Sequence, residues 1–197
     1  MSTIESREAI LGLVNSIVPC DAIEDRDQAA TVAWIQSGAE IFRIQKPDIP
    51  PKHLVAYFVV IDRVRMKLIL VDHIKAQRWL PTGGHVDIDE HPAITVSREI
   101  KEELDMEAHF IFQDPIFVTE TVTVGLTAGH RDVSLWYVVA GDVDKPINFD
   151  RNEFKDYRWF TFDEVLALEI NTLDPHMHRF VKKLQLMMQD DTNRSLH

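Results

Sequence analysis

Residues 84–106, GHVDIDEHPAITVSREIKEELDM, join a glycine-containing polar loop to a strongly acidic helical segment. Pro92 suits the first position of a helix. The apolar positions of the segment recur at helical spacing and form one stripe: Ala93, Val96, Ile100 and Leu104. Beside that stripe, Glu99, Glu102 and Glu103 fall within an arc of about 100° on the helix. We therefore predict a helix that packs on a sheet and presents an acidic edge to a site.

The acidic edge of this helix needs positive charge. Carboxylates on one helical face repel one another, and Arg98 is placed to pair with Glu102 four residues on and to reach back to Glu90. Hard oxygen ligands gathered in this way suit Mg²⁺ or Mn²⁺. A Glu-x-x-Glu-Glu pattern alone usually marks a solvated face, so the metal hypothesis depends on its combination with the glycine loop and Arg98.

The spacing of the whole segment resembles the Nudix box, G-x5-E-x7-R-E-U-x-E-E-x-G-U, where U is a bulky apolar residue. Eight of the nine specified positions agree between Gly84 and Met106. The exception is Asp105, where the box has a glycine that ends the helix. Asp tolerates the left-handed conformation better than most residues, so we expect Asp105 to end the helix in that conformation.

The resemblance extends over roughly residues 53–188 and implies an α/β fold, the Nudix α/β/α sandwich with a mixed sheet. We divide the chain into an N-terminal helical extension (residues 1–50), a Nudix hydrolase domain (51–190) and a polar tail (191–197). Two helices are expected before Gly38, and a last helix is expected to end near Met188. We predict strands at Ile41–Ile44, Leu54–Ile61, Met66–Val71, Phe110–Val124, Val133–Ala140 and Tyr157–Phe160, and a polar loop from Pro81 to His91.

The resemblance also implies a metal site. In the family, glutamates that match Glu99, Glu102 and Glu103 bind the divalent metal together with a backbone carbonyl that matches Gly83. A residue from a later loop often completes the site. Glu153 resembles the acidic loop residue of the MutT branch, although a solvated loop glutamate is an equal alternative, and Glu120 is a weaker candidate.

The catalytic roles follow from the metal site. The bound metal neutralises the charge of a diphosphate, polarises its oxygens and lowers the pKa of a water molecule. Either Glu103 or Glu153 then takes the proton of that water. We also count Glu102 and Arg98, both specified positions of the box, as catalytic.

Four further residues are candidates for substrate binding. Trp79 is placed to stack on a base, with core packing as the alternative. Arg78 is placed to contact phosphate, with an exposed, solvated charge as the alternative. His130 and Arg131 precede a strand and are candidates to border the pocket, with an ordinary turn as the alternative. None of the nine histidines belongs to a recognisable zinc-ligand pattern.

The resemblance implies hydrolysis of a diphosphate linkage in a nucleoside diphosphate derivative. ADP-ribose hydrolases of the family tend to have proline where this chain has Thr121, and dinucleoside polyphosphate hydrolases tend to have tyrosine near Thr123. Both markers are missing, which favours a nucleoside triphosphate pyrophosphatase or an enzyme for a substrate class that these markers do not identify. A catalytically quiet module that acts as a ligand sensor or interaction domain is the alternative. An isopentenyl diphosphate isomerase is disfavoured because its cysteine has no well-placed counterpart.

Composition limits the partners. The 197-residue chain has a formal net charge of −11, which opposes general nucleic-acid binding. Its longest apolar run, Leu54–Ile61, has eight residues against the roughly 20 of a membrane helix. Cys20 is the only cysteine, and the N-terminus has no secretory layout, so we expect a cytoplasmic protein. The apolar face of the N-terminal helices makes a homodimer one possibility, with a nucleotide or other diphosphate as the small-molecule substrate.

Overall fold

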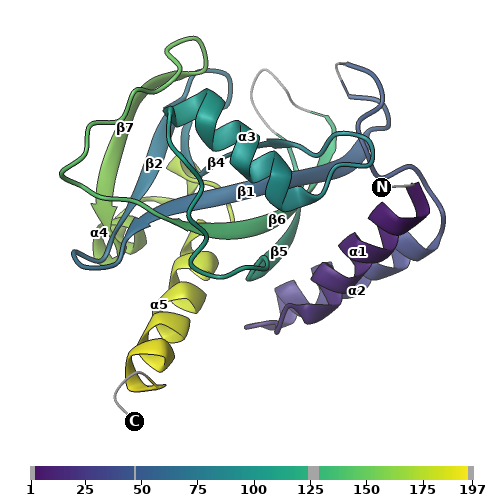
Figure 1. The fold of residues 1–197 in the computed structure, drawn as a ribbon, viewed down its shortest axis with the longest axis horizontal. Helices are drawn as coiled ribbons and strands as arrows, with labels where there is room; N and C mark the ends of the chain where they lie inside the picture. Colours follow the sequence, from purple (N-terminus) through teal and green to yellow (C-terminus); the bar gives the residue numbers. More distant parts are fainter. Residues whose placement is uncertain (1–2, 47, 124–128, 195–197) are drawn as a thin grey trace.

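In the computed structural model, a mixed sheet lies between helical layers (Figure 1), and residues 3–46, 48–123 and 129–194 are described. The helices are α1 (Thr3–Ser16), α2 (Ala22–Gln36), α3 (Pro92–Leu104), α4 (Phe162–Ala167), the 3₁₀ helix η2 (Ile170–Thr172) and α5 (Met177–Arg194). The strands are β1 (Lys52–Asp62), β2 (Lys67–His73), β3 (Arg78–Leu80), β4 (Thr82–His85), β5 (Phe117–Val122), β6 (Arg131–Ala140) and β7 (Phe154–Thr161).

The sheet is built around β1. Its main path runs β3-β2-β1-β6-β5, while β4 pairs with β1 and β7 pairs with β2. Only the β1–β6 pair is parallel among these pairings. The side chains of β1 are buried on both faces of the sheet, as is usual for a central strand covered by helices. The predicted mixed sheet and α/β/α sandwich are therefore confirmed.

Each face of the sheet has its own apolar cluster. Val96 and Ile100 of α3 pack with the β1 side chains Ala56 and Phe58 on one face. On the other face, α4 and α5 pack on the sheet, and the ring of Phe180 stacks on Trp136 at 4.9 Å between centroids. Helix α3 is thus fixed by its apolar stripe, which leaves its remaining face free for the site.

The N-terminal helices form a hairpin that packs on the α3 side of the sheet. Ile10, Val14 and Ile35 belong to the same buried cluster as α3. Two ion pairs also connect this hairpin to α5: Arg179 with Asp21 at 2.7 Å, and Lys183 with Glu24 at 2.6 Å. The extension therefore shares the core of the main domain, and its separate status stays a prediction.

Several local predictions were wrong. Ile41–Ile44 is not a strand, because Ile41 is buried by packing while its carbonyl accepts a single hydrogen bond from the Leu54 amide. The predicted loop from Pro81 to His91 contains β4, whose two glycines pair with β1 without any apolar alternation to announce a strand. Within Phe110–Val124, the described strand is only Phe117–Val122, and Val124 lies outside the described residues.

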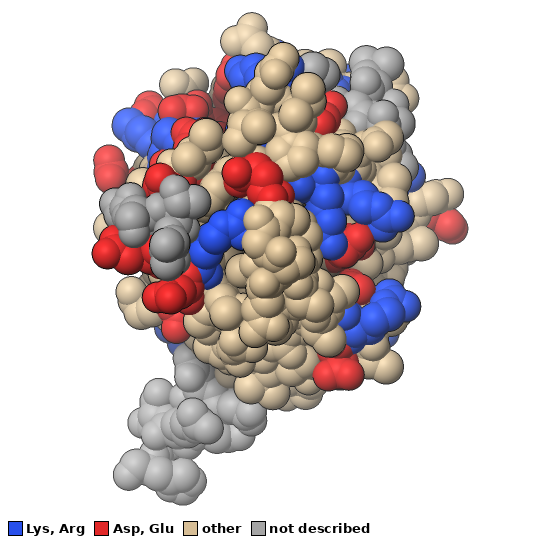
Figure 2. Space-filling view, turned by 90° about the vertical axis from the view of Figure 1, so that its right-hand side faces the viewer, with Lys and Arg blue, Asp and Glu red and all other residues tan. Residues whose placement is uncertain are grey.

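The C-terminal boundary also differs. Helix α5 continues to Arg194 instead of ending near Met188, so part of the predicted polar tail is helical. Residues 195–197 of that tail lie outside the described part. Among the helices of the described residues, none is long and apolar enough to cross a bilayer. On the face shown in Figure 2, acidic and basic side chains are interspersed.

Candidate functional site

Helix α3 presents its acidic side to a cavity next to β4. The side chain of His91 caps its first turn, and Pro92 follows, as the sequence predicts. At its end, Asp105 has φ 53° and ψ 37°, which confirms the left-handed conformation expected where the box has glycine. The Asp105 amide donates to the carbonyl of Lys101 at 3.2 Å, and the Met106 amide donates to the carbonyl of Ile100 at 3.3 Å. These two ends fix the position of the helix relative to β4.

Arg98 organises the carboxylates of α3. Its guanidinium lies 2.6 Å from Glu99, 3.3 Å from Glu90 and 3.8 Å from Glu102. The predicted contacts to Glu90 and Glu102 are thus confirmed, and the shortest contact, to Glu99, was not predicted. Although burial raises the pKa of Glu90, hydrogen bonds from Thr95 and Arg98 lower it overall. Arg98 therefore holds one end of the acidic face in place.

Glu103 is the most buried carboxylate of the helix face, with 6% of the residue exposed. The amide of Gly83 donates a hydrogen bond to its Oε2 at 3.2 Å. Among the described residues, no Lys or Arg forms an ion pair with Glu103. Burial, followed by the charges of Glu99 and Glu153, raises the pKa of Glu103 well above its ordinary value. In the described part of the chain, Arg98 thus compensates the charges of Glu90 and Glu99, whereas Glu103 has no cationic side chain paired with it.

The two glycines of β4 allow the helix to lie this close. Gly83 has φ 150°, and a Cβ there would overlap the Ala56 carbonyl of β1. A Cβ on Gly84 would instead overlap the carboxylate of Glu99. The first glycine is required by the backbone of the sheet, and the second is required by the acidic side chain of the site.

Glu153 reaches the same cavity from the loop before β7. The Asp150 amide donates to the carbonyl of Glu103 at 2.8 Å, and the Ile74 amide donates to the carbonyl of Glu153 at 2.9 Å. These two hydrogen bonds fasten the loop to α3 and to β2. The structure thus brings Glu153 together with Glu99, Glu102 and Glu103 along one cavity wall.

The cavity has a volume of about 1100 Å³, enough for a nucleotide-sized ligand. Of the four predicted substrate-binding residues, Arg78 and His130 line it. Trp79 packs edge-on against Phe160, at 5.4 Å between ring centroids, within the apolar cluster of the α5 side. Arg131 is exposed and pairs with Glu120 at 2.9 Å. Neither Trp79 nor Arg131 is among the described residues that line the cavity.

Glu120, the weaker metal candidate, has cationic partners. Besides Arg131, Lys52 lies 2.6 Å from its carboxylate. Although burial raises the pKa of Glu120, the hydrogen bond from Lys52 lowers it overall. Its charge is balanced by the chain itself, in contrast to that of Glu103.

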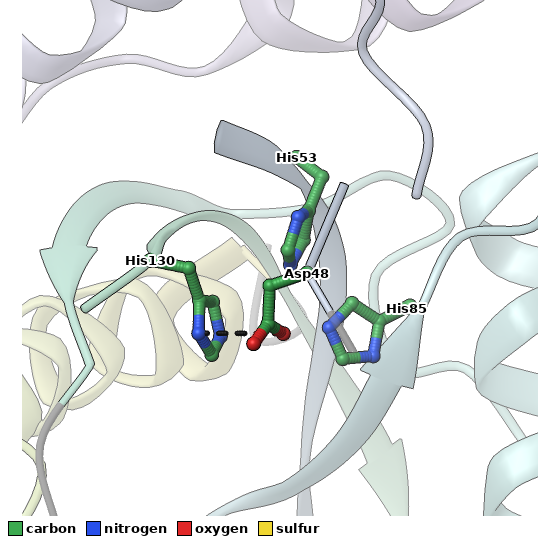
Figure 3. Close-up of side chains that lie close together, drawn as sticks. All are labelled: Asp48, His53, His85 and His130. Carbon is green, nitrogen blue, oxygen red and sulfur yellow. Dashed lines mark ion pairs between the residues drawn. The ribbon is translucent and has the colours of Figure 1, made fainter. Parts of the chain in front are cut away.

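The structure also brings together residues that no sequence pattern connects. Asp48, His53, His85 and His130 each offer a ligand atom, and these atoms lie within 4.8 Å of one another (Figure 3). The four residues come from separate segments of the chain, so no local spacing could reveal them. The pairing of β1 with β4 and β6 brings the three histidines together, and Asp48 joins them from the segment before β1.

Comparison with known proteins identifies the family. The model of the NUDIX domain matches residues 52–184. The chain belongs to the Nudix family. Members of this family generally hydrolyse diphosphate linkages with the help of divalent metals. No curated protein matches the chain significantly.

Solved structures share the fold at low identity. A NUDIX-family hydrolase from Clostridium perfringens is 18% identical, with a TM-score of 0.53 over 68% of this chain and 97% of that one. The E. coli dihydroneopterin triphosphate pyrophosphohydrolase is 15% identical, with a TM-score of 0.51 over 72% and 98%. The NUDIX domain of Shewanella oneidensis NrtR, solved with ADP ribose, is 15% identical, with a TM-score of 0.54 over 68% and 87%.

The residues of this Nudix chain fit a hard divalent cation. Glu99, Glu102, Glu103 and Glu153 line one wall of the cavity, and carboxylate oxygens are the ligands that Mg²⁺ and Mn²⁺ prefer. The buried charge of Glu103 has no cationic partner among the described residues, so an added cation would relieve a cost that the chain leaves unbalanced.

Proposed function

We propose that this Nudix protein hydrolyses a diphosphate linkage in a nucleoside diphosphate derivative with Mg²⁺ or Mn²⁺. Nucleoside triphosphates are the first class to test. In that reaction, water adds to one phosphorus of the anhydride and the triphosphate is divided into a nucleoside monophosphate and pyrophosphate. The observation that carries the proposal is the buried carboxylate of Glu103, which lies among other carboxylates at a cavity large enough for a nucleotide.

Each acidic residue has a proposed role. Glu99, Glu102 and Glu103, with the backbone carbonyl of Gly83, would hold the metal. When bound, that metal supplies charge neutralisation of the phosphates and activation of water. Either Glu103 or Glu153 receives the proton of the attacking water. Both carboxylates line the cavity, so both meet the first requirement for a general base.

Arg98 acts by positioning. Its guanidinium contacts Glu99 at 2.6 Å and Glu90 at 3.3 Å, so it fixes the side of α3 that faces β4. On the substrate side, Lys75 and Arg78 line the same cavity as the glutamates. We propose that these cations contact phosphate oxygens of the substrate. Trp79 stays a candidate for base stacking only if its edge-on contact with Phe160 opens.

A screen of phosphoanhydrides tests the proposal. Purified protein is incubated with nucleoside triphosphates, dinucleoside polyphosphates and ADP-ribose, each with Mg²⁺, with Mn²⁺ or with excess chelator. We expect metal-dependent release of a nucleoside monophosphate, together with pyrophosphate when a triphosphate is the substrate. A reaction that continues at full rate in chelator would contradict the proposed metal chemistry.

The alternative function is a catalytically quiet Nudix module that senses a ligand. It is favoured only by the binding-sized cavity, whereas the complete set of box glutamates favours catalysis. The same screen separates the two, because a sensor would bind one of the compounds and leave it intact. A cytoplasmic location, the absence of nucleic-acid and membrane partners, and a homodimer stay predictions from the sequence.

A further inference from the structure

Three histidines and an aspartate meet at one end of the sheet, as Figure 3 shows. His53 is the second residue of β1, and its register partner on β6 is Asp132. His85 ends β4 and pairs with Val55, two residues along β1. His130 directly precedes β6, and Asp48 comes from the segment before β1. The fold therefore supplies this cluster from four different segments.

We infer that Asp48, His53, His85 and His130 bind a transition-metal ion of the Zn²⁺ class. These ligands differ from the glutamates of α3, although Asp48, His85 and His130 line the same cavity. Imidazole nitrogens combined with a carboxylate favour zinc and its neighbours in the first transition series over Mg²⁺. The inference concerns binding, so it does not depend on the proposed hydrolase activity.

The strongest support comes from His53 and Asp132. Nδ1 of His53 lies 2.8 Å from the carbonyl of Pro50, to which only a protonated Nδ1 can donate. In the neutral ring, Nε2 then carries a lone pair and no proton. It lies 3.2 Å from Oδ1 of Asp132, another acceptor. Both atoms are buried and have no well-formed hydrogen bond to any described residue. Two such acceptors require positive charge close to them.

His130 also contacts this aspartate, and its Nδ1 lies 3.1 Å from the hydroxyl of Thr123. Its Nε2 lies 3.3 Å from the same Oδ1 of Asp132, and its Nδ1 lies 3.4 Å from Asp48. The ring of His53 stacks on that of His130 at 5.1 Å between centroids. One cation could therefore bind both His53 and His130. Asp132 would lie next to both rings, since its Oδ1 is close to Nε2 of each.

His85 contributes a partly buried imidazole. Its Nε2 lies 3.3 Å from the guanidinium of Arg43, which can only donate, so this nitrogen carries a lone pair and no proton. A neutral ring is the form that ligates metals. Its centroid lies 4.7 Å from that of His53.

The spacing of the cluster is compatible with one ion after small rotations. Two ligands of a tetrahedral ion with bonds of about 2.0 Å are about 3.3 Å apart. The four ligand atoms lie within 4.8 Å of one another, so the widest separation must close by about 1.5 Å. Asp48 and His85 are only partly buried, which leaves their side chains room to rotate.

A proton on His53 is the competing source of positive charge. Although burial lowers the pKa of His53, hydrogen bonding to Asp132 and to the Pro50 carbonyl raises it on balance. A single proton can bridge one nitrogen to one oxygen, whereas the cluster presents several acceptors to the same space. A metal ion satisfies them together, and a measurement of metal binding decides between the two.

The test titrates chelator-treated full-length protein with Zn²⁺ by calorimetry and with Co²⁺ by visible absorption. We expect one tight site per chain and a Co²⁺ spectrum of low coordination number. His53→Asn and His85→Asn should each weaken this binding at least about 100-fold. Loss of a residue that only hydrogen-bonds to a metal ligand already costs about 10- to 100-fold, and loss of the ligand itself should cost more. Asn keeps a donor near the position of Nδ1, so the Pro50 contact of His53 is retained.

Two matched controls separate this site from other metal ligands. His109→Asn changes an exposed histidine away from the cluster and should bind Zn²⁺ as the wild type does. Glu103→Gln alters the glutamate site and should also leave Zn²⁺ binding at the histidines intact. If the wild type binds no Zn²⁺ or Co²⁺, or if Glu103→Gln abolishes the binding while His85→Asn does not, the inference is overturned.

Arg43 provides a test with the opposite sign. Its guanidinium lies 3.3 Å from Nε2 of His85, where a cation opposes the approach of a divalent ion. Arg43→Gln is therefore expected to tighten Zn²⁺ binding several-fold. Unchanged or weaker binding in this variant, with wild-type folding by circular dichroism, would contradict a metal at this position.

Discussion

Two buried glutamates of this protein are held in opposite ways. Glu24 of α2 is fully buried, and its carboxylate lies 2.6 Å from Lys183 and 2.7 Å from the amide of Cys20. Glu103 of α3 is almost as buried, yet it receives the amide of Gly83 and faces other carboxylates. Burial of a charge costs several kcal/mol unless a partner compensates it. The charge of Glu24 is compensated by Lys183 of the same chain. No lysine or arginine of the described residues pairs with Glu103, which is therefore suited to bind a metal ion.

The largest expected effect is that of Glu103→Gln. The variant keeps an oxygen for the Gly83 amide but removes the charge that would hold the metal. We expect the hydrolysis rate to fall at least about 100-fold, the scale of losing one strong charge-stabilising group. In metal-free buffer the unfolding midpoint should not decrease, because the site disfavours a charge on Glu103 and glutamine carries none.

The control for that variant is Glu107→Gln, since Glu107 is exposed just beyond the end of α3. It should retain wild-type turnover. Addition of Mg²⁺ should raise the unfolding midpoints of the wild type and of Glu107→Gln. It should raise the midpoint of Glu103→Gln much less. Equal turnover in Glu103→Gln and wild type would remove the proposed role of this glutamate.

The second effect concerns Glu24. Glu24→Gln leaves Lys183 buried without its counter-charge, so we expect a loss of about 3 kcal/mol in the free energy of unfolding. Turnover of the folded protein should stay near the wild-type value, because the pair lies between α2 and α5. Denaturant titration measures the first quantity and steady-state kinetics the second.

The double variant Glu24→Gln/Lys183→Met sharpens this result. It removes both charges, so it should be more stable than Glu24→Gln alone. A double variant as unstable as the single one would mean that Glu24 stabilises the protein through the Cys20 amide, not through Lys183.

The difference between the two glutamates explains what could be predicted from the sequence. The helix of α3, its apolar stripe and the contacts of Arg98 with Glu90 and Glu102 follow from spacing within one segment, and these predictions were confirmed. The pairing of Glu24 with Lys183 connects residues at opposite ends of the chain. No local pattern announces such a contact, because it depends on where α5 comes to lie.

Strand β4 and the histidine cluster were missed for the same kind of reason. Gly83 and Gly84 carry no side chains that alternate between faces, so pairing with β1 is visible only in three dimensions. His53, His85 and His130 meet through strand register. Short-range chemistry was therefore predictable, whereas sites assembled by the sheet were not.

The third effect tests how closely β4 supports the acidic site. In Gly84→Ala, the new methyl group would overlap the carboxylate of Glu99, which must move. We expect Mg²⁺ binding to weaken about tenfold, with the fold retained because a flexible side chain gives way.

Gly83→Ala is the contrasting variant. Its methyl group meets the backbone of β1 at a φ of 150°, so this substitution should lower the unfolding midpoint instead. Calorimetric titration with Mg²⁺ and thermal unfolding separate the two, and a Gly84→Ala protein with unchanged Mg²⁺ affinity would contradict this position for Glu99.

The smallest effect is that of Asp105→Gly at the end of α3. Asp105 holds the left-handed conformation, with φ 53°, that glycine adopts without steric cost. The substitution also removes the exposed ion pair with Lys101, which contributes little. We expect the unfolding midpoint to rise by about 2 °C with turnover unchanged. Lys101→Met removes the ion pair but keeps Asp105, so it isolates that contribution. The prediction is contradicted if Asp105→Gly lowers the midpoint by more than Lys101→Met does. In that case Asp105 stabilises the helix end through a contact other than the ion pair with Lys101, and this contact outweighs the relief of backbone strain.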